Sequence, residues 1–248
     1  MKGAEFVLVD VSNTFTKIAF ASRDRLGKFR RLPTRDLTAK VLRELLQKTP
    51  ARHAVAASVV PSKNAVLSSA LPAPICWVGP QIKLGIGIDY PKPESIGADR
   101  LANTVAAAAL YGAPAIVVDF GTAVTFDVIS VDGNYVGGVI APGLSAMTDY
   151  LHARTALLPR VKLAEPPHAI GRSTLEAMKS GAVHGYRGLI AEIIRQVLKE
   201  IPSKRRPHII ATGGDAQLIA GETRLFTAVS PSLTLDGLRL IGNLNFPG

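Results

Sequence analysis

The sequence predicts an α/β protein of two related lobes, each with a mixed sheet that opens with an antiparallel hairpin. Three observations support this fold class. The chain has 248 residues, of which 47% are hydrophobic, so a sizeable core can form. Residues 6–21 and 115–130 share one pattern, in which an apolar strand ending in Asp leads through a small polar turn to a second strand. In both halves, strand-like runs alternate with apolar residues at helical spacing.

The first half contains two predicted helices. Apolar residues at helical spacing place them at residues 36–47 and 98–110. The motif YGAP at residues 111–114 ends the second helix, because Gly and Pro interrupt helices. We place the boundary between the lobes there. The N-terminal lobe is then 1–112, with the first hairpin, and the C-terminal lobe is 113–248, with the second hairpin.

The second half contains one long predicted helix. Ser173 and Glu176 form a capping-box pattern that opens it, and it runs to about Lys199. Small residues recur along it at Gly181 and Gly185, which would let another helix of the same subunit or of a second copy approach closely. The other predicted elements are a strand at 135–141, a helix after Pro142 and Gly143, a strand at 208–211 and a helix after Gly213 and Gly214.

The composition excludes several classes of protein. The formal charge of +10 favours anionic partners. Ten basic residues lie in residues 23–52, but without an RNA-binding signature, so a solvated face is preferred and no nucleic-acid partner is expected. A single cysteine, Cys76, excludes an intrachain disulfide and fits a reducing compartment. The histidines lack the spacing of zinc ligands, and no secretory signal or membrane span is recognised, so no membrane partner is expected.

The first hairpin carries the motif DVSNTFTK, which runs from Asp10 to Lys17. Backbone N–H groups and hydroxyls of such a turn can bind phosphate oxygens, and Lys17 adds a positive charge. Asp10 at a strand end is suited to holding Mg²⁺ through water. An ordinary hairpin with an Asx turn is the alternative interpretation. The related hairpin at Asp119 favours the binding site.

A second candidate region lies at residues 90–100. A Pro-rich loop leads into the helix that begins near Gly97, which places Asp99 and Arg100 in its first turn. The helix dipole favours the charge of Asp99. Arg100 has the opposite sign and needs another reason, such as bidentate binding of a carboxylate substrate.

The third candidate is the motif DFGTAVT at residues 119–125. Gly121 allows a ligand to approach the backbone closely, and Thr122 and Thr125 add hydroxyls. The pairs 137–138 and 213–214 add glycines at expected strand ends. Tight turns are the alternative interpretation of these pairs. Several such turns facing one cleft between the lobes would form a nucleotide site.

The order of these motifs resembles that of the type III pantothenate kinases over almost the whole chain. The resemblance implies the duplicated actin, sugar-kinase and Hsp70-like fold, with ribonuclease H-like lobes. It implies phosphorylation of pantothenate by ATP to 4'-phosphopantothenate, the first step of coenzyme A biosynthesis, by a cytoplasmic homodimer that needs Mg²⁺ and a monovalent cation, K⁺ or NH₄⁺. The motifs are D-x-x-N-T-x-x-K from Asp10, Y-P at Tyr90, GADR at 97–100, DFGTA at 119–123, GG at 137–138, PG at 142–143, GRST at 171–174 and TGGDA at 212–216.

The same resemblance implies a role for each matching residue. Asp99 would be the base that accepts the proton of the substrate hydroxyl, and Asp119 would bind potassium. The TGGDA turn would lie on the adenosine side, and Thr174 would reach pantothenate in the site of the partner subunit. The implied ATP-binding residues are Asp10 (also on Mg²⁺ through water), Val11, Ser12, Asn13, Thr14, Phe15, Thr16, Lys17 and Thr122, and the implied pantothenate-binding residues are Tyr90, Gly97, Ala98, Asp99, Arg100 and Thr174.

One position departs from the family pattern. The first turn usually reads Asp-x-Gly-Asn-Thr, and this chain has Ser12 in place of the glycine. Glycine alone adopts positive φ without cost, and its missing side chain lets phosphate approach. Two alternatives therefore stay open. One is a non-catalytic accessory or regulatory relative with an impaired ATP site, and the other is a different small-molecule kinase on the same fold.

Overall fold

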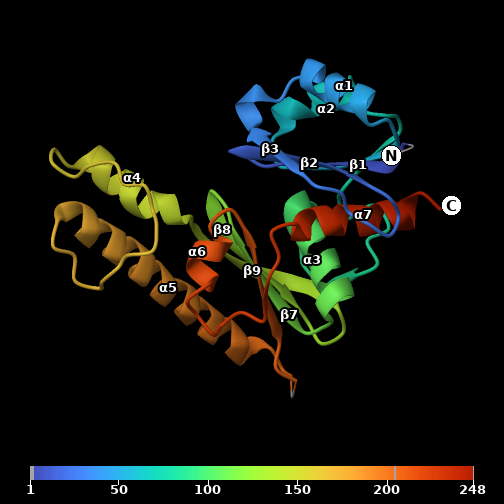
Figure 1. Ribbon diagram of the computed structural model, residues 1–248. Helices are drawn as coiled ribbons and strands as arrows, with labels where there is room; N and C mark the ends of the chain where they lie inside the picture. The colour runs from blue at the N-terminus through green and yellow to red at the C-terminus, as the bar shows by residue number, and fades with distance from the viewer. Residues whose placement is uncertain (1–2, 204, 248) are drawn as a thin grey trace. The chain divides into compact units, whose positions relative to one another are not determined.

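The computed structural model describes residues 3–203 and 205–247, which divide into two compact units (Figure 1). Unit 1 takes in the described residues up to Gly112, Gly133–Val136 and those from Ser232 onward. Unit 2 takes in Ala113–Asp132 and Gly137–Pro231. The chain first passes into unit 2 at the expected lobe boundary. The sequence-based division differs at the C-terminus, because the last helix belongs to unit 1.

Unit 1 is built on a mixed five-stranded sheet in the order β3-β2-β1-β4-β5. The pairs β1–β2 and β2–β3 are antiparallel, whereas β1–β4 and β4–β5 are parallel. A short strand, β6 (Gly87–Ile88), pairs with the first residues of β9. The other elements are β1 (Ala4–Val11), β2 (Phe15–Ala21), β3 (Arg30–Pro33), β4 (Ala51–Ser58), β5 (Ile75–Trp77), α1 (Ala39–Lys48), α2 (Asn64–Ser68), α3 (Ala98–Tyr111), α7 (Leu233–Asn245) and the 3₁₀ turns η1 (Thr34–Asp36), η2 (Pro61–Lys63) and η3 (Pro93–Ser95).

Helices cover both faces of this sheet (Figure 1). Because side chains alternate along a strand, β1 contributes to two cores. Phe6 and Leu8 point to the face that packs against α3 and α7. Val7 and Val9 point to the opposite face, which packs against α1 and α2. The strand is therefore apolar throughout, as expected for a central strand that is buried on both sides.

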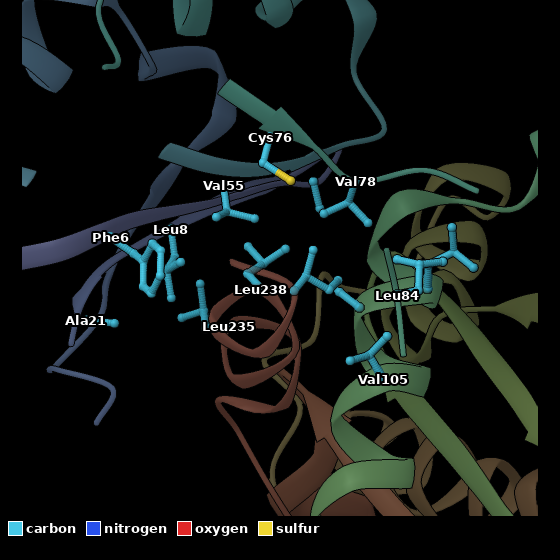
Figure 2. Packing of buried hydrophobic residues seen from close by; sticks show 14 of the residues in the cluster. Phe6, Leu8, Ala21, Val55, Cys76, Val78, Leu84, Val105, Leu235 and Leu238 are labelled. Carbon is cyan, nitrogen blue, oxygen red and sulfur yellow. The ribbon is translucent and has the colours of Figure 1, made fainter. Parts of the chain in front are cut away.

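The last helix, α7, completes the first of these cores. Its side chains Leu235 and Leu238 point toward Leu8 and Val55 of the sheet (Figure 2). At Gly237, the carbonyl oxygen of Ala102 in α3 occupies the space that a Cβ would need. The two helices therefore cross at backbone distance, and this packing assigns residues from Ser232 onward to unit 1.

Capping residues set where the predicted helices begin. The helix expected over 36–47 begins later, at α1, because the Thr38 side chain caps it by accepting a hydrogen bond from the Val41 N–H at 3.3 Å. The long helix begins as expected, because Ser173 Oγ accepts from the Glu176 N–H at 3.2 Å. Among the helices of the described chain, none combines the length and apolar character needed to cross a membrane.

Unit 2 repeats the opening hairpin within a sheet of the order β11-β10-β7-β8-β9. The first residues of β9 belong to unit 1, and β6 pairs with them as a sixth strand. β7 and β8 are antiparallel, and β10 is parallel to β7 and to β11. The second hairpin and the mixed sheet confirm the expected fold class. The elements are β7 (Ala115–Phe120), β8 (Ala123–Ile129), β9 (Asn134–Pro142), β10 (His208–Gly213), β11 (Ala228–Val229), α4 (Leu144–Arg154), α5 (Thr174–Glu200) and α6 (Ala216–Ala220).

One sequence-based expectation for unit 2 is wrong. Gly137 and Gly138 lie inside β9 and not in a turn at a strand end. Gly137 has a φ of 131°, a conformation that glycine adopts without strain, so the strand continues through it. The core of unit 2 lies between α5, α6 and the sheet face that carries Val118 and Phe120.

Candidate functional site

The first hairpin places two charged residues side by side. Asp10 of β1 is buried, and its cross-strand neighbour is Lys17 of β2. Residues in register on paired strands project to the same face. Asp10 and Lys17 therefore share the face that carries Phe6, Leu8 and Ala19, which is the face covered by α3 and α7. A carboxylate and an ammonium group at a strand end suit metal-bound phosphates.

The turn between these strands accommodates Ser12 without strain. Among the residues that the structure describes, only glycines have a positive φ, so Ser12 adopts an ordinary backbone conformation. Its N–H donates to the carbonyl oxygen of Phe15 at 3.2 Å. The conformational freedom of glycine is therefore not required at position 12. The remaining residues of the motif follow in order, with Val11 ending β1, Asn13 and Thr14 completing the turn, and Phe15 and Thr16 beginning β2.

The start of α3 lies at the same edge of unit 1 as this hairpin. The N–H of Val59, just after β4, donates to the carbonyl oxygen of Val11 at 3.0 Å. A Cβ placed on Gly97 would lie 3.6 Å from Val59 Cγ1 and 2.6 Å from Asp99 Oδ1. Asp99 Oδ1 also accepts from the Arg100 N–H at 2.9 Å. Since α3 packs on the face that carries Asp10, both candidate regions of unit 1 share one face and one edge.

One aromatic ring lies beside Arg100. Its guanidinium carbon lies 5.6 Å from the ring centroid of Tyr135, in cation–π range. Tyr90 meets the same ring edge-on, with centroids 5.8 Å apart. The structure thus brings Tyr90 and Arg100 together on Tyr135, while Ala98 begins α3. Sequence analysis missed Tyr135 because its strand gives no indication that it lies beside the loop of residue 90.

In unit 2, three predicted turns gather at one end of the sheet. The Gly214 N–H donates to the carbonyl oxygen of Phe120 at 2.9 Å. Gly213 has a φ of +96°, and a Cβ there would lie 2.6 Å from Asp119 Oδ1. Gly143 donates its N–H to the carbonyl oxygen of Thr122 at 3.1 Å and has no room for a side chain. Backbone groups of these turns and the carboxylate of Asp119 thus lie close together, and the absence of side chains at the glycines lets a ligand reach them.

Hydroxyl groups flank Asp119 on its neighbouring strands. Thr125 of β8 and Thr212 of β10 are both in register with Asp119, so all three project to one face. Thr212 is fully buried, and its Oγ1 has no hydrogen-bond partner among the described residues. A buried hydroxyl without a partner is costly, which marks Thr212 as a candidate ligand for a bound group.

Tyr186 of α5 is hydrogen-bonded to one of these turns. Its hydroxyl donates to the carbonyl oxygen of Pro142 at 3.1 Å. Burial, with a smaller contribution from the charge of Asp215, raises the pKa of Tyr186 far above its ordinary value. The raised pKa favours the protonated phenol, which is the form that donates this hydrogen bond.

The remaining predicted residue, Thr174, is exposed at the first position of α5 in unit 2. Several apolar side chains on α4 and in the segment between α4 and α5 are also exposed. Tyr150 is 64%, Leu157 90% and Ile170 83% exposed. Apart from the neighbouring residues and the backbone of α5 itself, no atom of the described chain lies within 4 Å of a Cβ placed on Gly181 or Gly188. The glycines of α5 at these two positions therefore do not serve packing within the subunit.

Comparison with known proteins agrees with the motif order. A model of the type III pantothenate kinase family matches residues 6–196. A type III pantothenate kinase from Akkermansia muciniphila is 49% identical over 97% of this chain and 99% of its own length. Another from Methylacidiphilum infernorum is 42% identical over 96% of this chain and 88% of its own length.

Solved structures with little sequence similarity share the fold. The inorganic polyphosphate/ATP-glucomannokinase from Arthrobacter sp. strain KM superposes with a TM-score of 0.52 at 17% identity, over 98% of this chain and 100% of that one. MreB 5 of Spiroplasma citri gives a TM-score of 0.54 at 10% identity, over 95% of each chain. The chain therefore has the fold of actin-like and sugar-kinase-like proteins.

Proposed function

The chain belongs to the type III pantothenate kinase family, and we propose that it transfers the terminal phosphoryl group of ATP to the primary hydroxyl of pantothenate. The product is 4'-phosphopantothenate, and the reaction opens coenzyme A biosynthesis. One observation carries most of the proposal: the Asp10–Lys17 hairpin and the Asp99–Arg100 helix start share one face and one edge of unit 1. The phosphate and alcohol ends of the reaction need such an arrangement.

The first hairpin would bind the phosphates of ATP. Residues from Asp10 to Lys17 would supply backbone N–H groups, hydroxyls and one ammonium group. Thr122 of unit 2 is the further residue that the family pattern assigns to ATP. Phosphoryl transfer passes through a loose transition state, so positioning and charge neutralisation dominate. Lys17 would neutralise negative charge on the transferred group.

The start of α3 would bind and activate pantothenate. Arg100, held over the ring of Tyr135, would bind the carboxylate of the substrate. Tyr90, Gly97 and Ala98 would line the same site. The ionised carboxylate of Asp99 would accept the proton of the primary hydroxyl, and a stronger base is not required for a loose transition state.

Two cation sites are part of the proposal. Asp10 would hold Mg²⁺ through water, since a buried carboxylate at a strand end suits this ion. Asp119, with the unpartnered hydroxyl of Thr212 beside it, would hold K⁺ or NH₄⁺. These cations supply neutralisation of negative charge around the transferred phosphoryl group.

The backbone at Ser12 argues against the accessory-factor alternative. That alternative depends on Ser12 impairing the ATP site, and Ser12 takes an ordinary conformation. A different small-molecule kinase is disfavoured because the relatives, at 49% and 42% identity over nearly the whole chain, are both named type III pantothenate kinases.

The kinase would work as a cytoplasmic homodimer. The exposed apolar side chains Tyr150, Leu157 and Ile170 and the open glycine positions of α5 suit contact with a second copy. Thr174 at the start of α5 would then reach pantothenate in the partner subunit. Gly181→Leu should shift sedimentation from dimer to monomer, and an unaltered dimer would remove α5 from the interface. No membrane or nucleic acid is involved in this proposal.

The purified protein tests the reaction directly. ATP-dependent phosphorylation of pantothenate, measured with Mg²⁺ and with or without K⁺, should be saturable in both substrates. Asp99→Asn should fold normally and lower turnover by a factor on the order of 10² to 10⁴. Unchanged turnover in that variant would exclude Asp99 as the base, and absence of phosphorylation by the unaltered protein would reject the function.

A further inference from the structure

A buried threonine behind the first hairpin contacts the turn at three points. Thr34, in η1, is almost fully buried. Its N–H donates to the carbonyl oxygen of Thr14 at 2.9 Å. Its hydroxyl donates to the carbonyl oxygen of Ser12 at 2.6 Å and lies 3.0 Å from the Thr16 hydroxyl. Since Thr34 gives its only hydroxyl proton to Ser12, Thr16 must be the donor in the last of these bonds.

These bonds approach the turn from the side away from the charged pair. Thr16 is in register with Val11, and Val11 packs with Leu37 in the core beneath α1. Asp10 and Lys17 project to the opposite face. Thr34 therefore holds the turn from behind and leaves the phosphate-facing side open.

The bonds also fix the direction of two peptide planes. Outside the two Pro peptides at residues 73–74 and 113–114, the described peptide bonds are trans, so each N–H points opposite to the carbonyl of the same plane. With the carbonyls of Ser12 and Thr14 turned toward Thr34, the N–H groups of Asn13 and Phe15 point away from it. These two N–H groups, from alternate peptide planes, lie on the side of the turn where we place the cradle for an anion.

The strand before Thr34 stabilises the same arrangement. β3 pairs with β2, with Phe15 opposite Pro33. The guanidinium carbon of Arg31 lies 3.5 Å from the centroid of the Phe15 ring. Strand pairing and the Arg31–Phe15 contact therefore fix the segment 30–36 against the start of β2. Thr34, which belongs to this segment, restricts the turn through its hydrogen bonds.

We infer that Thr34 is a positioning residue for the phosphates of ATP, an inference that rests on the proposed kinase function. It acts through the peptide planes of the Ser12–Phe15 turn and does not touch the nucleotide. Removal of its hydroxyl takes away the 2.6 Å bond to the half-buried carbonyl of Ser12, which lets the turn rotate and weakens the cradle.

Thr34→Val and Thr34→Ser separate this role from packing. Valine keeps the volume and removes the hydroxyl, whereas serine keeps the hydroxyl. We expect Thr34→Val to raise both the calorimetric Kd for a non-hydrolysable ATP analogue with Mg²⁺ and the KM for ATP about tenfold. The KM for pantothenate should stay within about twofold, and Thr34→Ser should restore ATP binding to within about twofold.

A matched control is Thr38→Val, which removes the cap of α1 and should lower the melting temperature without changing ATP binding. The Thr16 side chain projects to the Thr34 side of the turn, opposite Asp10 and Lys17, so Thr16→Val removes the bond donated to Thr34 and no side-chain contact to the phosphates. It should raise the Kd about threefold, which tests the inference if Thr34→Val does not fold. An unchanged Kd in a folded Thr34→Val protein, or no restoration by serine, would overturn the inference.

The calorimetric readout distinguishes this inference from the proposed function. If the unaltered protein binds the ATP analogue but does not phosphorylate pantothenate, the function fails, and the Thr34 comparison still decides the positioning role. If the unaltered protein does not bind the analogue, both are rejected.

Discussion

Gly97→Ala should separate catalysis from folding. Gly97 has φ −57° and ψ 138°, which alanine adopts without strain. The added Cβ would lie 2.6 Å from Asp99 Oδ1, about 0.7 Å short of ordinary carbon–oxygen contact. The carboxylate must therefore swing away, whereas the contacts to Arg100 and Val59, both at 3.6 Å, are ordinary.

Gly97→Ala should change the free energy of unfolding little and kcat strongly. Alanine is a poorer N-cap than glycine, but it also reduces the entropy of the unfolded chain, and each effect is worth about 1 kcal/mol. The net change in the free energy of unfolding should stay within about 1 kcal/mol, which shifts the melting temperature by less than about 4 °C. Displacing the proposed base by this amount should lower kcat about 10²-fold.

Steady-state phosphorylation of pantothenate and a thermal melt measure both quantities. The KM for ATP should stay within about twofold, because the hairpin is untouched. Gly79→Ala is the matched control, since no atom lies within 4 Å of a Cβ at that position. A folded Gly97→Ala protein with the turnover of the unaltered chain would refute the assignment of Asp99 as the base.

Three further variants test the stability of unit 2. Gly213→Ala combines a φ of +96° with a Cβ 2.5 Å from the Phe120 carbonyl oxygen, so it should lower the melting temperature by at least about 5 °C. Ser173→Ala removes the cap of α5 and should cost about 1 kcal/mol, measured by urea unfolding. Arg187 donates to Glu165 at 2.8 and 2.6 Å and lowers the pKa of that carboxyl. The resulting stability is present above the ordinary pKa of about 4.3 and lost as pH falls through the lower folded value. Because 44% of the Glu165 side chain is exposed, Arg187→Gln should remove less than about 1 kcal/mol of this acid-dependent stability, and an unchanged pH profile of the melting temperature would contradict the pairing.

The repeat in the sequence predicted both hairpins correctly. The Asp that ends each first strand aligned at Asp10 and Asp119, and both lie on antiparallel pairs, opposite Lys17 and Thr125. Local patterns sufficed here, because strand alternation and a short polar turn determine a hairpin without distant contacts. The motif order likewise identified the family, which the comparisons confirm.

Contacts between distant segments could not be predicted in this way. Thr34 bonds to Ser12 of the first turn from 22 residues away, and nothing in its neighbourhood distinguishes it from other threonines. Tyr135 meets Arg100 only because the start of β9 pairs with β6. The last helix was missed because Gly237 lowers its intrinsic helix propensity, and its formation depends on packing against α3. The roles of the individual site residues stay predictions.

The return of α7 to unit 1 has a consequence for synthesis on the ribosome. The sheet of unit 1 is complete once β5 has emerged, yet the face that carries Phe6 and Leu8 waits for Leu235 and Leu238. All of unit 2 is translated during that interval. A nascent chain that stalls before Ser232 has α3 but not α7 on this face, so part of its apolar sheet stays exposed, which is the kind of surface that chaperones recognise.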